Sequence, residues 1–225
     1  MTKDLTVGRP LKVIFDFAVP VFLGYLFQQF YNLVDTIIVG QFLGVSALAS
    51  VGSTGSLNFM IIGFCMGLCS GFAIPVAQKF GAKDFCGMRQ FVFNSAVLGG
   101  IFSIVLTAVT VIFCKPLLVL LKTPADVVDG AYDYFVVILA GIPVVILYDL
   151  LSGIIRAVGD SKTPLYFLIF SAVLNIILDL IFIACFGWGI PGAAYATVIS
   201  QGIAGIICFF YMHRKFEILR LNKED

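Results

Sequence analysis

The sequence predicts an all-α, polytopic membrane protein with six transmembrane helices, and its composition is the first reason. Of its 225 residues, 60% are hydrophobic and only 12% are charged, whereas soluble domains are about 45–50% apolar and about 25% charged. The mean hydropathy is +1.07. So few charges cannot cover a surface that faces water, and the lipid bilayer is the expected surrounding. A net charge of +1 gives no reason to expect a nucleic-acid partner.

Six stretches are long and apolar enough to cross a bilayer, which takes about 20 mostly apolar residues in a helix. They cover residues 13–38, 48–75, 90–114, 131–155, 164–186 and 191–212. Together they form a predicted transmembrane lobe over residues 13–212. The polar segment 1–12 is predicted to be a cytoplasmic N-terminus, and 213–225 a cytoplasmic tail or linker.

The orientation of the lobe follows from its basic residues. With residues 1–12 placed inside, every lysine and arginine except Lys115 and Lys122 falls in an inner segment. Cytoplasmic loops carry an excess of these residues in membrane proteins. The sequence therefore predicts a multi-pass protein of the plasma membrane with both termini in the cytoplasm.

Polar residues interrupt the first predicted span, in the stretch QQFYNLVDTIIVG at 28–40. Gln28, Asn32 and Asp35 are separated by four and three residues, a spacing that places them on one face of a helix. Gln28 and Asn32 are candidates for lining a substrate cavity. Helix–helix hydrogen bonding is an equally good explanation for the glutamine.

Two later spans carry polar residues at the same helical spacing. In the fifth span, Asn175 and Asp179 are four residues apart, and in the sixth span so are Thr197 and Gln201. Gln201 joins the candidate lining of the cavity, although hydrogen bonding between helices also explains Gln201 and Thr197. Helices one, five and six are therefore each predicted to carry a polar stripe in otherwise apolar surroundings.

The aspartates Asp35 and Asp179 are not well explained by a structural role and are therefore the main candidates for a functional one. A carboxylate at the centre of a bilayer costs about 2.5–3.5 kcal/mol on insertion scales, whereas hydrogen bonds between membrane helices average about 0.6 kcal/mol. No lysine or arginine is predicted at the same depth to neutralise them. Two neighbouring carboxylates cannot both ionise cheaply, so the pair is suited to taking and releasing a proton.

Other cations suit the same group of residues. Together with Asn175 and Thr197, the two aspartates offer the oxygen ligands that Na⁺ prefers, with Asp35, Asn175 and Asp179 as its candidate metal ligands. A carboxylate pair also attracts organic cations. The sequence shows no activated nucleophile, phosphate-binding loop or cluster of metal ligands, so neither enzymatic activity nor a cofactor is expected beyond H⁺ or Na⁺ as a coupling ion.

Pro20 lies inside the first span, fifteen residues before Asp35. A proline removes one backbone hydrogen bond from a helix and permits a kink. The kink is either a static bend or a hinge whose angle responds to the charge on Asp35.

Several segments resemble those of one known family, the multidrug and toxic compound extrusion (MATE) transporters. The stretch VPVFLGYLFQQFYNLVDTIIVGQFLGVSALASVG is similar to their first two helices, and VAQKFGAKD followed by RQ is similar to the loop after helix two. The stretch IIRAVGDSKTPLYFLIFSAVLNIILDLIFI, with GIPGAAYATVISQ, resembles the segment from the end of helix four to helix six. The resemblance covers nearly the whole chain.

This resemblance implies a twelve-helix transporter in which two six-helix lobes enclose a central cleft. Such proteins export cationic or amphipathic compounds in exchange for H⁺ or Na⁺. By resemblance to the bacterial branch named after DinF, Asp35 matches the acid of helix one and Pro20 matches its bend. Asn175 and Asp179 match the pair on helix five, and Thr197 matches the hydroxyl on helix six.

The chain covers one lobe of that architecture. It is therefore expected to be either an N-terminal fragment or a half-size transporter that pairs with itself or with another six-helix lobe. Two alternatives stay open. One is a lipid-linked oligosaccharide flippase of the same superfamily, which should have a basic cleft, and the other is a membrane scaffold subunit that transports nothing.

Overall fold

The computed structural model describes residues 9–219, and this part of the chain is helical apart from short turns. Five helices are each long and apolar enough to cross a membrane, and a pair of helices bent by 46° meets the same criteria together and makes a sixth crossing when it is counted as one span. The predicted all-α class with six spans is confirmed. The predicted terminal segments, 1–12 and 213–225, lie partly outside the described residues.

Helix α1, Pro10–Ser53, is interrupted at one position. Gly44 has φ 85° and ψ −176°, a conformation that glycine adopts readily and other residues rarely do. The chain changes direction there and reaches α2, Gly55–Gly81, through Thr54. The predicted second span, 48–75, therefore begins in the last part of α1, beyond the kink at Gly44.

The next crossing pair consists of a long helix and a bent one. Helix α3 covers Phe85–Leu120 and extends beyond both ends of its predicted span. Helices α4, Val128–Ala140, and α5, Ile142–Ala157, together form the fourth crossing. Gly141 lies between them at the 46° bend.

The last two crossings are α6, Lys162–Asp179, and α7, Ile190–Lys215. Helix α6 continues as a π-helical segment η1, Leu180–Cys185. A short 3₁₀ turn η2, Glu217–Leu219, follows α7. The π-helical segment widens the helix directly after Asp179, and such irregularities occur often at functional sites.

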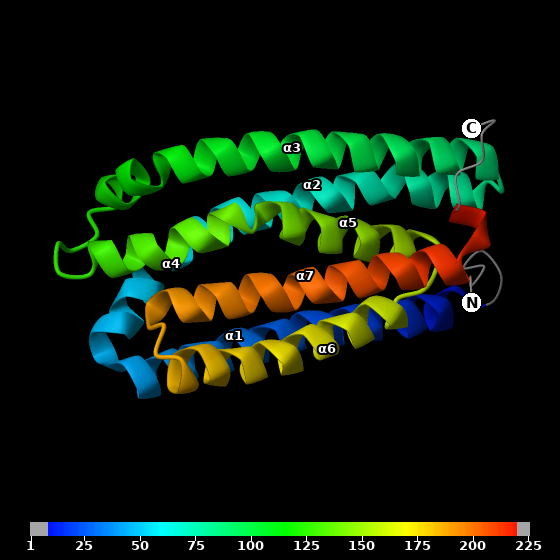
Figure 1. Ribbon diagram of the computed structural model, residues 1–225. Coiled ribbons are helices and arrows are strands. Elements are labelled where there is room, and N and C mark those ends of the chain that lie inside the picture. The colour runs from blue at the N-terminus through cyan, green and yellow to red at the C-terminus, as the bar shows by residue number, and fades with distance from the viewer. Residues whose placement is uncertain (1–8, 220–225) are drawn as a thin grey trace.

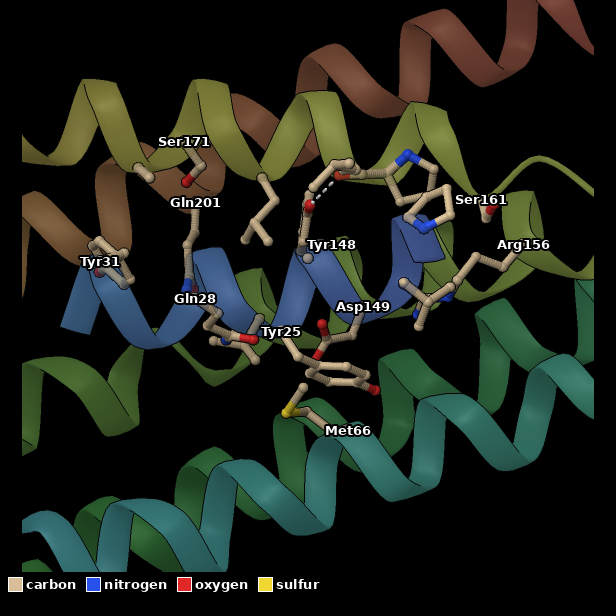
Figure 2. A pocket seen from close by; sticks show the side chains of 18 of the residues that line it. Tyr25, Gln28, Tyr31, Met66, Tyr148, Asp149, Arg156, Ser161, Ser171 and Gln201 are labelled. Carbon is tan, nitrogen blue, oxygen red and sulfur yellow. Dashed lines mark hydrogen bonds between the residues drawn. The ribbon is translucent and has the colours of Figure 1, made fainter. Parts of the chain in front are cut away.

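Helix α7 lies at the centre of the bundle, where it packs against α4, α5 and α6 (Figure 1). Helices α2 and α3 form one side, since α2 packs on α5 and α3. Helix α1 packs on α6 and α4 on the other side, and it contacts α2 only sparsely although the two are consecutive. The separation of α1 from α2 leaves room for a cavity between them and α5 (Figure 2).

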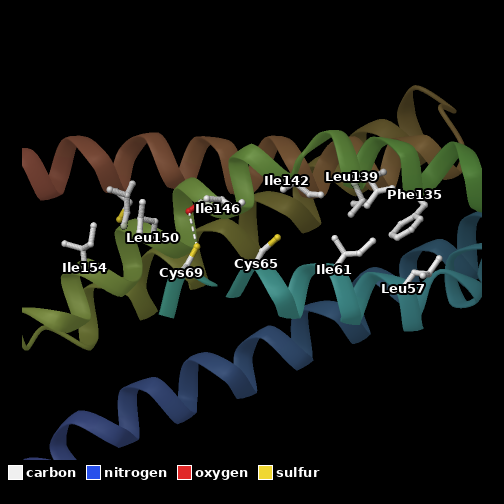
Figure 3. Packing of buried hydrophobic residues seen from close by; sticks show 14 of the residues in the cluster. Leu57, Ile61, Cys65, Cys69, Phe135, Leu139, Ile142, Ile146, Leu150 and Ile154 are labelled. Carbon is white, nitrogen blue, oxygen red and sulfur yellow. Dashed lines mark hydrogen bonds between the residues drawn. The ribbon is translucent and has the colours of Figure 1, made fainter. Parts of the chain in front are cut away.

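The apolar core is most regular where α2 packs on α5 (Figure 3). One face of α2 presents buried side chains at every fourth residue, and α4 and α5 present a matching row. They are Leu57, Ile61, Cys65 and Cys69 on α2, facing Phe135, Leu139, Ile142, Ile146 and Leu150. The Cys69 thiol lies 3.7 Å from the carbonyl oxygen of Ile146, because small side chains allow membrane helices to approach closely.

Candidate functional site

The structure brings Asp35 and Asp179 together from α1 and α6. Asp35 is 8% exposed and Asp179 is fully buried, and the two carboxyl groups act on each other electrostatically. Within the described residues, Oδ1 of Asp35 and both carboxyl oxygens of Asp179 have no hydrogen-bond partner. Buried acidic oxygens without a donor are costly, so this acid pair is an arrangement that a proton or a metal cation would stabilise.

Asn175 and Thr197 belong to the same cluster. The Thr197 hydroxyl accepts a hydrogen bond from Asn175 Nδ2 at 3.3 Å and donates one to the carbonyl oxygen of Ala193 at 3.1 Å. The amide oxygen of Asn175 is buried without a donor, like the acid pair. All four residues predicted to bind a cation thus lie in one region between α1, α6 and α7.

The donor set fits the Na⁺ expected from the sequence, since carboxylate, amide and hydroxyl oxygens are the ligands of hard cations. The residues described contain no group of three or more His, Cys, Asp or Glu side chains arranged to hold a metal ion. A site built from two aspartates and the Asn175 amide needs no such group. It carries fewer charges than a divalent-metal site and suits a monovalent ion or a proton.

Two tyrosines that the sequence analysis missed complete the surroundings of the acid pair. The Tyr31 hydroxyl donates to Thr197 Oγ1 at 3.2 Å. Tyr134 of α4 is buried and interacts electrostatically with both aspartates. Tyr31 precedes Asp35 by four residues, so helical spacing was a usable signal for it. Tyr134 comes from a different crossing and carries no such signal.

Beside the acid pair lies a cavity of ≈ 90 Å³ between α1, α2, α5, α6 and α7 (Figure 2). Gln28 from α1 and Gln201 from α7 both line it, as the sequence analysis predicted for a substrate cavity. Asn32 is not among its lining residues. Its side chain is exposed and donates to Gln29 Oε1 at 3.3 Å, because Asn32 faces the side of α1 that α6 and α7 leave uncovered.

The cavity also contains a charged pair that the sequence analysis did not single out. Asp149 and Arg156 are seven residues apart on α5, which places them on one helical face, and both line the cavity. Asp149 lies within the predicted fourth span but was overlooked there. Arg156, which the sequence analysis assigned to an inner loop, lies in the last turn of α5 and lines the cavity. A single arginine two turns from an aspartate does not make the basic cleft expected of a flippase.

Pro20 is buried and lines the same cavity. Helical φ/ψ angles continue through Pro20, and Gly44 is the position where α1 departs from them. The hinge at Pro20 therefore stays a prediction.

These features define a class of protein: a multi-pass helical membrane protein whose crossings enclose an acid pair next to a cavity. Within that class the chain belongs to the MatE family, whose profile matches residues 20–181. The resemblance drawn from the sequence motifs is confirmed. Members of this family are transporters and not enzymes.

Curated relatives carry names that refer to drug export. The chain is 35% identical to "Probable multidrug resistance protein YpnP" of Bacillus subtilis over 98% of this chain and 50% of the relative. It is 30% identical to "Multidrug export protein MepA" of Staphylococcus saprophyticus over 94% of this chain and 47% of that protein. The chain thus spans about half the length of the curated relatives it matches.

Solved structures agree with this assignment. A structure described as MATE in the bent conformation matches 100% of this chain and 51% of its own, with 30% identity and a TM-score of 0.90. The structure of an outward-facing multidrug resistance MATE family transporter matches 98% of this chain and 49% of its own, with 29% identity and a TM-score of 0.88. The described bundle is therefore similar to one half of each of these transporters.

Proposed function

We propose that this chain is one lobe of a cation-coupled multidrug antiporter, which exports cationic or amphipathic compounds in exchange for H⁺ or Na⁺. The second lobe is either a continuation of the same protein, a second copy of the chain, or a separate partner. The drug-export names of the relatives support the substrate class. Both ends of the lobe and the loop after α5 are placed on the cytoplasmic side of the plasma membrane, as the basic residues suggest.

The observation that carries this proposal is the acid pair. Asp35 and Asp179 come from different crossings, are buried together, and leave three carboxyl oxygens without hydrogen bonds. A helix–helix contact with only a structural role would gain as much from amides, at a lower insertion cost. The acids are therefore best explained by a cation that binds and leaves.

Coupling follows from the position of the cavity. Tyr31 lines the cavity and donates its hydroxyl to Thr197, which also accepts from Asn175. A compound that fills the cavity changes the position of Tyr31, and so changes the surroundings of the acid pair. Because linkage between two binding sites is reciprocal, a cation on the acid pair must alter the affinity for the compound to the same extent. Alternating access results when the two ligands favour opposite conformations.

The test uses the purified chain in lipid nanodiscs, with ethidium as the probe compound. Addition of ethidium should release protons at fixed Na⁺, or release bound Na⁺ at fixed pH, and the two arms identify the coupling ion. Asp35→Asn and Asp179→Asn should each abolish the proton release and sharply reduce the Na⁺ release, without lowering the unfolding temperature. Asp133→Asn, at an exposed position on α4, is the matched control.

Two results would contradict the proposal. Undiminished release in both Asn variants would remove the acid pair from the mechanism. Unchanged stability of both variants, with no ethidium-driven release even in the wild type, would favour a scaffold, because amides serve a structural contact equally well. Efflux from vesicles is expected only when a second lobe is supplied. Drug efflux by the chain in a proven monomeric state would therefore refute the need for that lobe.

A further inference from the structure

A third aspartate lies in the cavity wall, apart from the acid pair. Asp149 of α5 lines the cavity wall, and its Oδ2 atom is buried without a hydrogen-bond partner among the described residues. The proposed exchange of cation and compound at Asp35 and Asp179 gives Asp149 no role. A buried carboxylate oxygen without a donor needs another explanation, since its desolvation is unfavourable.

Arg156 reduces this cost but does not remove it. Seven residues of α-helix place it about 10.5 Å from Asp149 along the axis of α5, where it attracts the carboxylate electrostatically. Oδ2 of Asp149 nevertheless keeps no hydrogen bond. Arg156 is thus positioned as a nearby positive charge that competes with any other cation for Asp149.

The rest of the lining offers oxygen ligands and space. Tyr25, Gln28 and Tyr148 line the cavity and carry hydroxyl or amide oxygens (Figure 2). The Tyr148 hydroxyl donates its proton to the carbonyl oxygen of Pro164 at 3.0 Å, which leaves its lone pairs for a cation. A volume of ≈ 90 Å³ holds several waters, since one water takes about 30 Å³ in the liquid. Such a lining suits a partly hydrated alkali cation.

The cavity extends from the surroundings of the acid pair to the end of the bundle where α5 turns into α6. At one end Tyr31 belongs to its wall and to the hydrogen-bonded cluster of Thr197 and Asn175. At the other end lie Arg156 and Ser161, at the end of the bundle where α5 turns into α6. Asp149 lies between these two ends on α5.

We propose that Asp149 is a second binding site for a monovalent metal cation, held with part of its hydration shell between the acid pair and the Arg156 end of the lobe. The cation bridges Asp149 with the Gln28 and Tyr148 oxygens through water. Arg156 weakens its binding and so favours its release toward that end. The inference rests on the proposed function in one respect, that Asp35 and Asp179 form the coupling site from which the cation arrives.

The experiment measures equilibrium binding of radioactive Na⁺ to the purified chain in nanodiscs. The variant Asp35→Asn/Asp179→Asn should lose the tighter binding and keep a weaker component. Adding Asp149→Asn to that variant should abolish the weaker component, whereas adding Asp133→Asn should leave it intact. Adding Arg156→Gln should tighten it severalfold, because the competing charge is gone.

A second substitution keeps the test decisive if Asp149→Asn does not fold, which circular dichroism and size-exclusion chromatography would show. Asp149→Glu retains the charge and should retain the weaker Na⁺ binding. The inference is overturned if the Asp35→Asn/Asp179→Asn variant binds no Na⁺, or if its residual binding survives Asp149→Asn. Failure of the proposed function has a different signature, since it leaves the tighter component unchanged in Asp35→Asn/Asp179→Asn.

Discussion

Gly141, at the bend between α4 and α5, should tolerate no side chain. A Cβ atom built there would lie 2.5 Å from Cγ2 of Val198 on α7 and 3.1 Å from the carbonyl oxygen of Ile138. Normal contacts between carbon atoms are about 3.5–4.0 Å, and a valine side chain has little freedom to rotate away. The bend must therefore open or α7 must shift, which displaces Tyr134 and Asp149 on the two halves of this crossing.

We expect Gly141→Ala to lower the free energy of unfolding by about 1–3 kcal/mol, the usual cost of overpacking a core. Gly100→Ala in α3 is the matched control, because a Cβ there meets no atom within 4 Å. It should be neutral or stabilising by up to about 1 kcal/mol, since alanine favours a helix over glycine. Unfolding in mild detergent, followed by tryptophan fluorescence and circular dichroism, measures both changes.

The contact with Val198 provides the decisive comparison. Val198→Ala removes the two methyl groups that obstruct the new Cβ, so Gly141→Ala/Val198→Ala should recover most of the loss caused by Gly141→Ala alone. The two substitutions must then be strongly non-additive. Purely additive effects, or a Gly141→Ala variant as stable as the wild type, would refute the steric argument.

Two further predictions concern Pro20 in α1 and the turn between α2 and α3. Pro20→Ala restores a backbone hydrogen bond in α1 and should reduce the change in distance between spin labels on its two halves when H⁺ or Na⁺ is added; an unchanged response would remove the hinge. In the turn between α2 and α3, hydrogen bonds from Lys79 Nζ at 2.7 Å and from the Gly87 N–H at 3.0 Å lower the pKa of Asp84 below its ordinary value of 3.8. The stabilisation is thus complete above that value and lost as the pH falls through the lowered pKa. Asp84→Ala should therefore lower the unfolding temperature near neutral pH and match the wild type in strong acid, while the exposed Asp126→Ala shows no such difference.

The structure places some of the polar residues where their predicted roles require them, and places one of them elsewhere. Asp35, Asn175, Asp179 and Thr197 lie together, which is the arrangement that a cation site requires. Asn32 is excluded from the cavity, although its spacing from Asp35 placed it on nearly the same face. Two side chains three residues apart on a helix differ in direction by about 60°. That difference is enough to turn one of them from an interface toward an open surface, and spacing alone does not show which way it points.

Fold class, number of crossings and the candidate acids could be predicted from the sequence by itself. Lipid imposes a strict rule on composition and length, because every backbone group must be satisfied within a helix about 20 residues long. An aspartate in such a helix is conspicuous for the same reason. These are properties of single helices, so they need no knowledge of how the helices are arranged.

The tertiary structure alone decided which helices meet. It placed Tyr134 of α4 beside the acids of α1 and α6, and it joined Asp149 and Arg156 to a cavity whose wall includes Tyr31. It also set the end of the first crossing at Gly44, where a positive φ turns the chain. Contacts between crossings depend on how side chains of different helices fit together, and the periodicity of one helix carries no information about its neighbours.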